Sequence, residues 1–183
     1  MSLKARTKGF HASIGELDTR GKQTKDEDRE KRLLLGGRSM GARAAVIAAN
    51  EYLAQQQDEK HGLSQKWPTA RLILISYPLL GPKNELRDQI LLDLPQDVDV
   101  LFIVGDKDAM CPLDLLDETR KRMKARSQLV TVKDADHGMH VKGGMGREKE
   151  IGEETGRVAA RWVDGKLKTT KDGETEVIDE ETV

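Results

Sequence analysis

The sequence contains few of the residues that mark several common protein classes. Its single cysteine, Cys111, excludes an internal disulfide. Aromatic residues make up 3% of the chain, so a core must be built from Leu, Ile, Val, Met and Ala side chains. A chain of 183 residues with 37% apolar residues is long enough to form one domain around such a core. We expect a protein of a reducing compartment, in the cytoplasm or the nucleus.

The sequence also lacks an excess of either charge and lacks long apolar runs. It carries 31 basic and 32 acidic residues, which gives a net charge of −1. Proteins that bind nucleic acids or anionic membranes usually carry a basic excess, so we expect neither partner. The apolar runs are far shorter than the roughly 20 residues that span a bilayer. Residues 1–21 lack the apolar stretch of a signal peptide.

Differences in amino-acid composition divide the chain into three parts. Residues 1–32 are polar, and we expect them to be irregular and partly disordered, with the mixed-charge run 25–32 forming a solvated loop. Residues 33–163 alternate short apolar runs with helix-like segments and form the predicted domain. Residues 164–183 are acidic and poor in apolar side chains, so we expect a disordered tail.

The middle part predicts an α/β fold with about four parallel strands flanked by helices. The predicted strands are residues 33–37, 71–78, 99–105 and 128–132. The predicted helices are residues 40–53, 84–94, 112–125 and 147–163. Continuous apolar runs suit strands covered on both faces, and alternation with helices indicates βαβ units.

The first chemical motif is Gly37-Arg38-Ser39-Met40-Gly41, which follows an apolar strand and opens an Ala-rich helix. This is the setting of a nucleophile elbow, a tight strand-to-helix turn that exposes a strained serine. The pattern also suits a glycine-rich turn with an incidental serine. The strand before it and the helix after it favour Ser39 as a nucleophile.

Two loops after later strands carry the acid and the base that such a serine needs. Asp106 and Asp108 follow the third strand, and His137 and His140 follow the fourth. Ligand sites of open α/β sheets lie at these carboxyl ends of the strands. The order Ser39, Asp108, His137 is the Ser…Asp…His order of α/β-hydrolases. Asp106 is the better candidate for a turn-capping acid, and His140 is the competing base.

Other chemistries have weaker support. Asp136, His137 and His140 are metal-ligand types, but the chain has no HExxH pattern and no second His or Cys cluster, so we expect no metal. The glycines of the elbow fit neither G-x-G-x-x-G nor a P-loop, so we expect no nucleotide cofactor. Cys111 is more typical of a small buried filler than of a nucleophile.

These stretches resemble the α/β-hydrolase superfamily, on its dienelactone-hydrolase-like side. The similarity is greatest to the α/β-hydrolase-like family that contains the third subunit of the NSL histone-acetyltransferase regulatory complex. The stretches that carry it are Gly36-Gly37-Arg38-Ser39-Met40-Gly41-Ala42-Arg43, Ser76-Tyr77-Pro78-Leu79 with Leu86-Arg87, and Gly105-x-x-Asp108 with Asp136-His137. The resemblance implies Ser39 as nucleophile, Asp108 as acid and His137 as base. It prefers Asp108 because the family's acid lies three residues after the glycine.

The sequence departs from the family pattern upstream of the elbow. α/β-Hydrolases place several strands before it, whereas residues 1–32 are polar. We therefore expect the C-terminal part of the fold, with the N-terminal strands absent and one sheet edge exposed. The amide of Met40 would supply one oxyanion donor. The second, which comes from a loop after an upstream strand, has no counterpart in the sequence.

Two functions are consistent with these residues. The first is a serine hydrolase that cleaves an ester- or thioester-type acyl bond of a small molecule through Ser39, Asp108 and His137, without a cofactor. The second is a non-catalytic hydrolase-like scaffold, such as a chromatin-complex interaction subunit. In that case a protein partner or a second copy of the chain would cover the exposed sheet edge.

Overall fold

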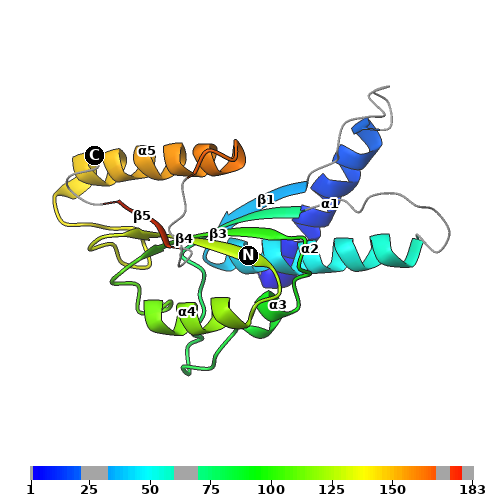
Figure 1. Ribbon diagram of the computed structural model, residues 1–183, viewed down its shortest axis with the longest axis horizontal. Helices are drawn as coiled ribbons and strands as arrows, with labels where there is room; N and C mark the ends of the chain where they lie inside the picture. The colour runs from blue at the N-terminus through cyan, green and yellow to red at the C-terminus, as the bar shows by residue number, and fades with distance from the viewer. Residues whose placement is uncertain (1, 22–32, 60–69, 168–173, 179–183) are drawn as a thin grey trace.

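The computed structural model describes residues 2–21, 33–59, 70–167 and 174–178 (Figure 1). Its strands are β1 (Leu33–Arg38), β2 (Ala70–Ile75), β3 (Asp99–Gly105), β4 (Arg126–Val132) and β5 (Glu174–Ile178). Its helices are α1 (Leu3–Gly21), α2 (Met40–Glu59), α3 (Gln89–Leu92), α4 (Leu113–Arg122) and α5 (Gly144–Val163). These elements confirm the predicted α/β class.

All strands run parallel in one sheet of order β1-β2-β3-β4-β5. The register pairs Arg38 with Ile75 and Ile75 with Ile103, so β1 and β2 end level with each other and β3 continues beyond them to Gly105. Gly105 at the end of β3 pairs with Val132 at the end of β4. Because the strands are parallel, the loops that follow β1, β3 and β4 meet at one edge, where the predicted site residues lie.

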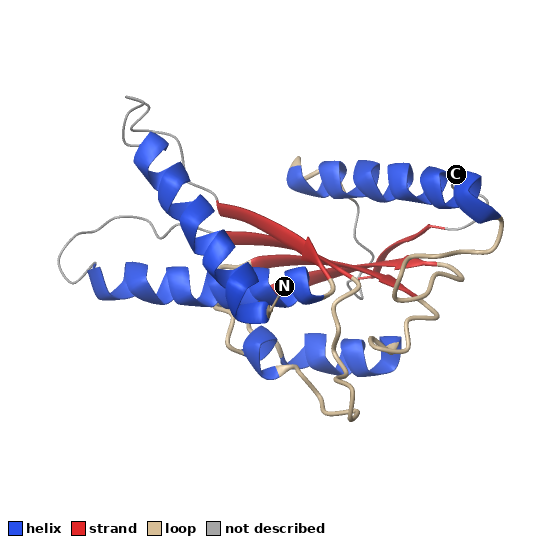
Figure 2. Ribbon diagram, turned by 180° about the vertical axis from the view of Figure 1, so that it is seen from behind, coloured by secondary structure: helices blue, strands red, loops and turns tan. Residues whose placement is uncertain are grey.

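Helices cover both faces of the sheet. In Figures 1 and 2, α2, α3 and α4 lie on one side of it and α5 on the other. The side chains of β3 alternate accordingly. Phe102 and Val104 join the core under α2 and α4, whereas Leu101 and Ile103 join the core under α5. The buried positions of α5, among them Ile151, recur at helical spacing and form the stripe that faces the sheet.

The expectation that residues 1–32 are irregular is wrong for Leu3–Gly21, which form α1. This helix packs along α2, and its contact face includes Thr7, Phe10 and Ile14 at helical spacing. Three of its positions are glycine and few are apolar, so its sequence alone is a weak helix former. Tertiary packing on α2 therefore stabilises it. The run 25–32 lies outside the described residues.

The expectation of a disordered tail at residues 164–183 is wrong for Glu174–Ile178, which form β5 beside β4. Ile178 is buried in the α5-side core together with Val130 and Val132. A short strand of mixed composition can be stabilised by pairing with a neighbouring strand, and the sequence of the short strand itself does not reveal that pairing. The sheet therefore contains one strand more than the sequence predicts.

Other differences concern the ends of elements. The second strand stops at Ile75 rather than at residue 78, because Ser76 turns the chain with a φ of 46°. The predicted helix 84–94 shortens to α3, and an isolated antiparallel bridge joins Leu80 to Leu86 in the loop before it. Helix α2 continues beyond Leu53 to Glu59. In the described ranges, no helix combines the length and apolar character that crossing a bilayer requires.

Candidate active site

The elbow at Ser39 is built as its sequence predicts. Ser39 lies between β1 and α2 with a φ of 52°, and its amide donates to the carbonyl of Ile75 at 3.0 Å. Positive φ in a non-glycine residue is strained and marks a functional turn. A Cβ atom on Gly37 would lie 2.5 Å from the carbonyl carbon of Gly41, so only glycine lets α2 start this close to β1.

The acid loop and the base loop are held together by their backbones. The amide of Lys107 donates to the carbonyl of Ala135 at 3.0 Å. A Cβ on Gly105 would lie 2.1 Å from that same carbonyl oxygen, so this close approach requires glycine. The carboxylate of Asp108 is buried and accepts a hydrogen bond from the amide of Met110 at 2.9 Å. The acid is thus held in place by contacts other than its hydrogen bonds to His137.

Ser39, His137 and Asp108 form one chain of hydrogen bonds. The hydroxyl oxygen of Ser39 lies 2.9 Å from Nε2 of His137. Nδ1 of the same ring lies 2.9 and 3.0 Å from the two carboxylate oxygens of Asp108. A carboxylate accepts only, so Nδ1 carries the proton and Nε2 is the base facing the serine. The side chain of His137 is 27% exposed, which leaves the reacting end open to a substrate.

The structure assigns the competing residues to other partners. Asp106 accepts from the amide of Asp134 at 2.7 Å and lies 4.0 Å from the Lys107 ammonium group. His140, whose side chain is 67% exposed, turns Nδ1 toward Asp136 at 3.1 Å. Hydrogen bonds from the amide and ring of His140 hold the pKa of Asp136 below its usual range. Asp106 therefore caps a turn, and the ring of His140 is paired with Asp136.

The metal candidates do not converge either. His137 and His140 each direct Nδ1 at a different carboxylate, Asp108 and Asp136. Within the described part of the chain, no three Cys, His, Asp or Glu side chains gather at metal-binding distance. The donors that a metal would need are thus already engaged in separate pairs.

Met40 is the first residue of α2, directly after the nucleophile. Amides in the first turn of a helix have no carbonyl partner within that helix, and they lie at the positive end of its dipole. This position suits the Met40 amide as a donor to an oxyanion. Upstream of β1, the described residues 2–21 contribute α1 and no strand.

Sequence reasoning missed a buried support behind the elbow. The guanidinium of Arg43, in the first turn of α2, lies near the hydroxyl of Tyr77, where its positive charge opposes the effect of burial on the tyrosine pKa. That hydroxyl in turn donates to the carbonyl of Arg87 at 3.0 Å. Burial is the main cause that raises the pKa of Tyr77 far above its ordinary value. An arginine within the apolar run of α2 is the one signal that could have suggested this support.

Cys111 is not placed to act as a nucleophile. It is fully buried, and its amide donates to the carbonyl of Asp108 at 3.0 Å. Burial, followed by the negative charge of Asp108, raises the pKa of the Cys111 thiol to about 12. The thiol is therefore protonated at neutral pH and unreactive. This agrees with the prediction that Cys111 is a small buried filler.

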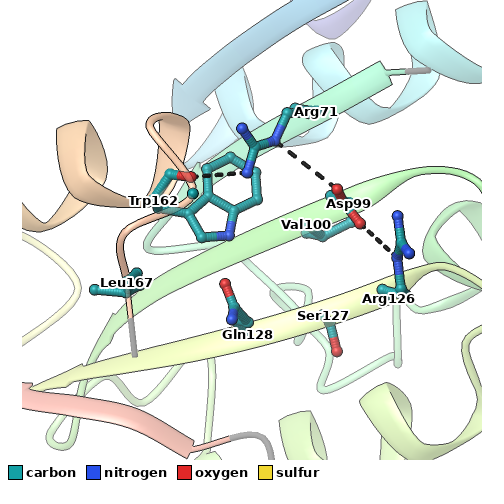
Figure 3. A pocket seen from close by; sticks show the side chains of 9 residues that line it. Arg71, Asp99, Val100, Arg126, Ser127, Gln128, Trp162 and Leu167 are labelled. Carbon is teal, nitrogen blue, oxygen red and sulfur yellow. Dashed lines mark hydrogen bonds and ion pairs between the residues drawn. The ribbon is translucent and has the colours of Figure 1, made fainter. Parts of the chain in front are cut away.

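A cavity of about 250 Å³ lies at the opposite, amino-terminal end of the sheet and contains none of the triad residues (Figure 3). The guanidinium of Arg71 lies 4.2 Å from the ring centre of Trp162 and donates to the carbonyls of Trp162 and Val163. Asp99 pairs with both Arg71 and Arg126. These contacts fix the last turn of α5 to the sheet.

The parallel sheet, the elbow and the Ser-His-Asp arrangement together define an α/β-hydrolase-type protein. Comparison with protein families agrees, since the family described as an alpha/beta hydrolase domain matches residues 10–164. The chain belongs to this family. The matched region begins within α1 and ends just after α5, so it includes all three residues of the triad. No solved structure matches the chain.

Proposed function

We propose that this protein is a serine hydrolase that cleaves an ester- or thioester-type acyl bond of a small molecule. The observation that carries the proposal is the unbroken hydrogen-bond chain from Ser39 through His137 to Asp108. Its support is geometric, because nucleophile, base and acid come from three separate loops and meet within hydrogen-bond distance. Membership of the alpha/beta hydrolase domain family agrees with it.

In the acylation step, Nε2 of His137 takes the proton of the Ser39 hydroxyl as its oxygen forms a bond to the carbonyl carbon. The carbonyl oxygen becomes an oxyanion next to the Met40 amide. The buried carboxylate of Asp108 holds the ring in its tautomer and stabilises the imidazolium. When the bond to the leaving group breaks, His137 returns the proton to the departing oxygen or sulfur, and an acyl group remains on Ser39.

The deacylation step repeats the same chemistry with water. Water gives one proton to Nε2 of His137 while its oxygen bonds to the acyl carbon. The bond to Ser39 then breaks, the serine oxygen recovers the proton, and a carboxylic acid leaves. With a single assigned donor to the oxyanion, we expect slow turnover, since one donor is worth about 3 kcal/mol in other hydrolases.

Labelling with a fluorophosphonate tests the proposal directly. The wild-type protein is expected to gain one adduct on Ser39, found by peptide mass spectrometry, and Ser39→Ala is expected to gain none. Ser13→Ala is a matched control, because Ser13 lies on α1 and its hydroxyl donates to the carbonyl of Gly9 in the same helix. A folded wild-type sample that stays unlabelled at Ser39 would rule the proposal out.

A second candidate, an interaction scaffold, is favoured by the outer edge of β1. Among the described residues, β1 pairs only with β2, and Leu34 on it is 46% exposed. Open edges with apolar side chains readily pair with another chain. Light scattering with size-exclusion chromatography tests this candidate. Self-association that Leu34→Lys abolishes, in a protein that does not label at Ser39, would favour it over the hydrolase.

A further inference from the structure

Arg38 places a cation beside the triad. It is the last residue of β1, directly before Ser39, and it shares the α5 side of the strand with Leu34 and Gly36. Its Nη2 lies 3.4 Å from the carbonyl oxygen of His137, a residue 99 positions away. The guanidinium therefore stands next to the base and on the base side of the nucleophile.

The charge of Arg38 is not neutralised by a carboxylate among the described residues. Three acids of the neighbouring loops are already used: Asp108 by His137, Asp106 by the Asp134 amide and Lys107, and Asp136 by His140. Within the described part of the chain, Arg38 makes a long hydrogen bond to a neutral carbonyl, and its side chain is exposed, so most of its five N–H donors stay available.

The backbone at this edge adds to the same positive potential. Helices α2 and α5 follow β1 and β4, so both begin at the edge that holds the triad. Neither has an acidic residue in its first turn, where acids usually offset the positive end of the helix dipole. A substrate anion near Arg38 would therefore meet a cation and the start of α2, whose dipole no acidic residue of its first turn offsets.

We infer that Arg38 recognises an anionic group, a carboxylate or a phosphate, on the leaving-group side of the substrate. The inference rests on the proposed hydrolase function. His137 must stand beside the leaving atom in order to protonate it, and Arg38 contacts the backbone of His137 itself. A planar guanidinium with free donors binds such groups in a bidentate manner. The substrate class is thus an ester or thioester of a hydroxy or mercapto acid, or of a phosphorylated alcohol or thiol.

Two acetate esters of matched size test this specificity. 4-Acetoxybenzoate carries a negative charge on its leaving group, and 4-acetoxybenzamide is its neutral counterpart. After correction for their spontaneous hydrolysis, the wild-type kcat/KM is expected to favour the benzoate by about threefold to tenfold, the range of a partly exposed charge pair. Added NaCl should reduce the preference. Arg38→Met is expected to abolish this preference, so that the ratio of kcat/KM for the two esters falls to about one.

Lys142→Met is the matched control, because it removes one exposed positive charge from the same edge, three positions after Met139 in the base loop. It should keep the preference. The inference is overturned if the wild-type protein hydrolyses both esters equally, or if Arg38→Met slows both equally, which would make Arg38 only a support for the base loop. If neither ester reacts and Ser39 also fails to label with the fluorophosphonate, the proposed hydrolase function falls, and the inference with it.

Discussion

Gly37 and Gly41 flank the nucleophile symmetrically in the sequence, but the structure gives them different roles. A Cβ on Gly37 would lie 2.5, 2.6 and 2.8 Å from backbone atoms of Gly41 and Ala42. Backbone cannot rotate away as a side chain can, so Gly37→Ala must push α2 off β1. Around Gly41, apart from its chain neighbours and the backbone of its own helix, no described atom lies within 4 Å of the added methyl, and its φ is not positive.

The two substitutions are expected to change the free energy of unfolding in opposite directions. Overpacking of this kind costs about 1–3 kcal/mol, and Gly37→Ala belongs at the upper end because three backbone atoms clash. For a chain of this size that loss lowers Tm by roughly 6–12 °C, at about 2–4 °C per kcal/mol. Gly41→Ala replaces a helical glycine by the best helix former and should be neutral or stabilising by up to about 1 kcal/mol.

The assay is thermal and urea denaturation followed by circular dichroism, with fluorophosphonate labelling of Ser39 as a second readout. Gly37→Ala should be destabilised and label slowly, because its elbow is displaced. Gly41→Ala should match the wild-type protein in stability or exceed it. Equal destabilisation by the two substitutions would refute the reasoning that close approach of the backbone, rather than the motif as such, requires glycine.

The remaining predictions concern the acid, the cysteine and the far end of the sheet. Asp108→Asn should lower kcat by about 10³–10⁴-fold through the wrong histidine tautomer, whereas Asp106→Asn should retain most activity; equal losses in ester hydrolysis would contradict the assignment. Burial raises the pKa of the Cys111 thiol to about 12 in the folded protein, against roughly 8.5 in the unfolded chain. Above about pH 8.5 the unfolded chain loses this proton while the folded protein keeps it, so folding stability should fall as pH rises. Urea titrations of Cys111→Ala should lack this loss. Arg71→Met should lower the free energy of unfolding, measured by urea denaturation, by about 2–3 kcal/mol, because two carbonyls at the end of α5 lose their donor. Arg126→Met should lower it by under about 1 kcal/mol, because the Arg126 side chain is 73% exposed. A larger loss for Arg126→Met than for Arg71→Met would argue against this role of Arg71.

The strands of the central sheet were predictable because each is a short, continuous apolar run. Leu33 to Leu35 and Val100 to Val104 cannot be exposed without cost, and bounded runs of this length suit buried parallel strands. The helix α1 and the strand β5 were not predictable. Their stability comes from α2 and β4, which lie far from them in the sequence, and local composition carries no trace of such contacts.

The ends of elements escaped prediction for a related reason. Ser76 stops β2 with a positive φ, although its residue type is compatible with a strand. Its amide bonds to the carbonyl of Ile103 at 2.9 Å, so the neighbouring strand determines where β2 ends. The support formed by Arg43 and Tyr77 likewise depends on two segments that meet only in the folded chain.

The sequence by itself determined the elbow and the order of the triad residues, because strained turns and strand ends restrict which residue types they accept. It favoured Asp108 over Asp106 and His137 over its competitor His140, without showing which side chains meet. Only the tertiary structure decided between them, because the approach of Gly105 to Ala135 aligns one acid with one imidazole. Hydrogen bonds depend on distances of tenths of an ångström between loops, and residue spacing along a chain does not specify those distances.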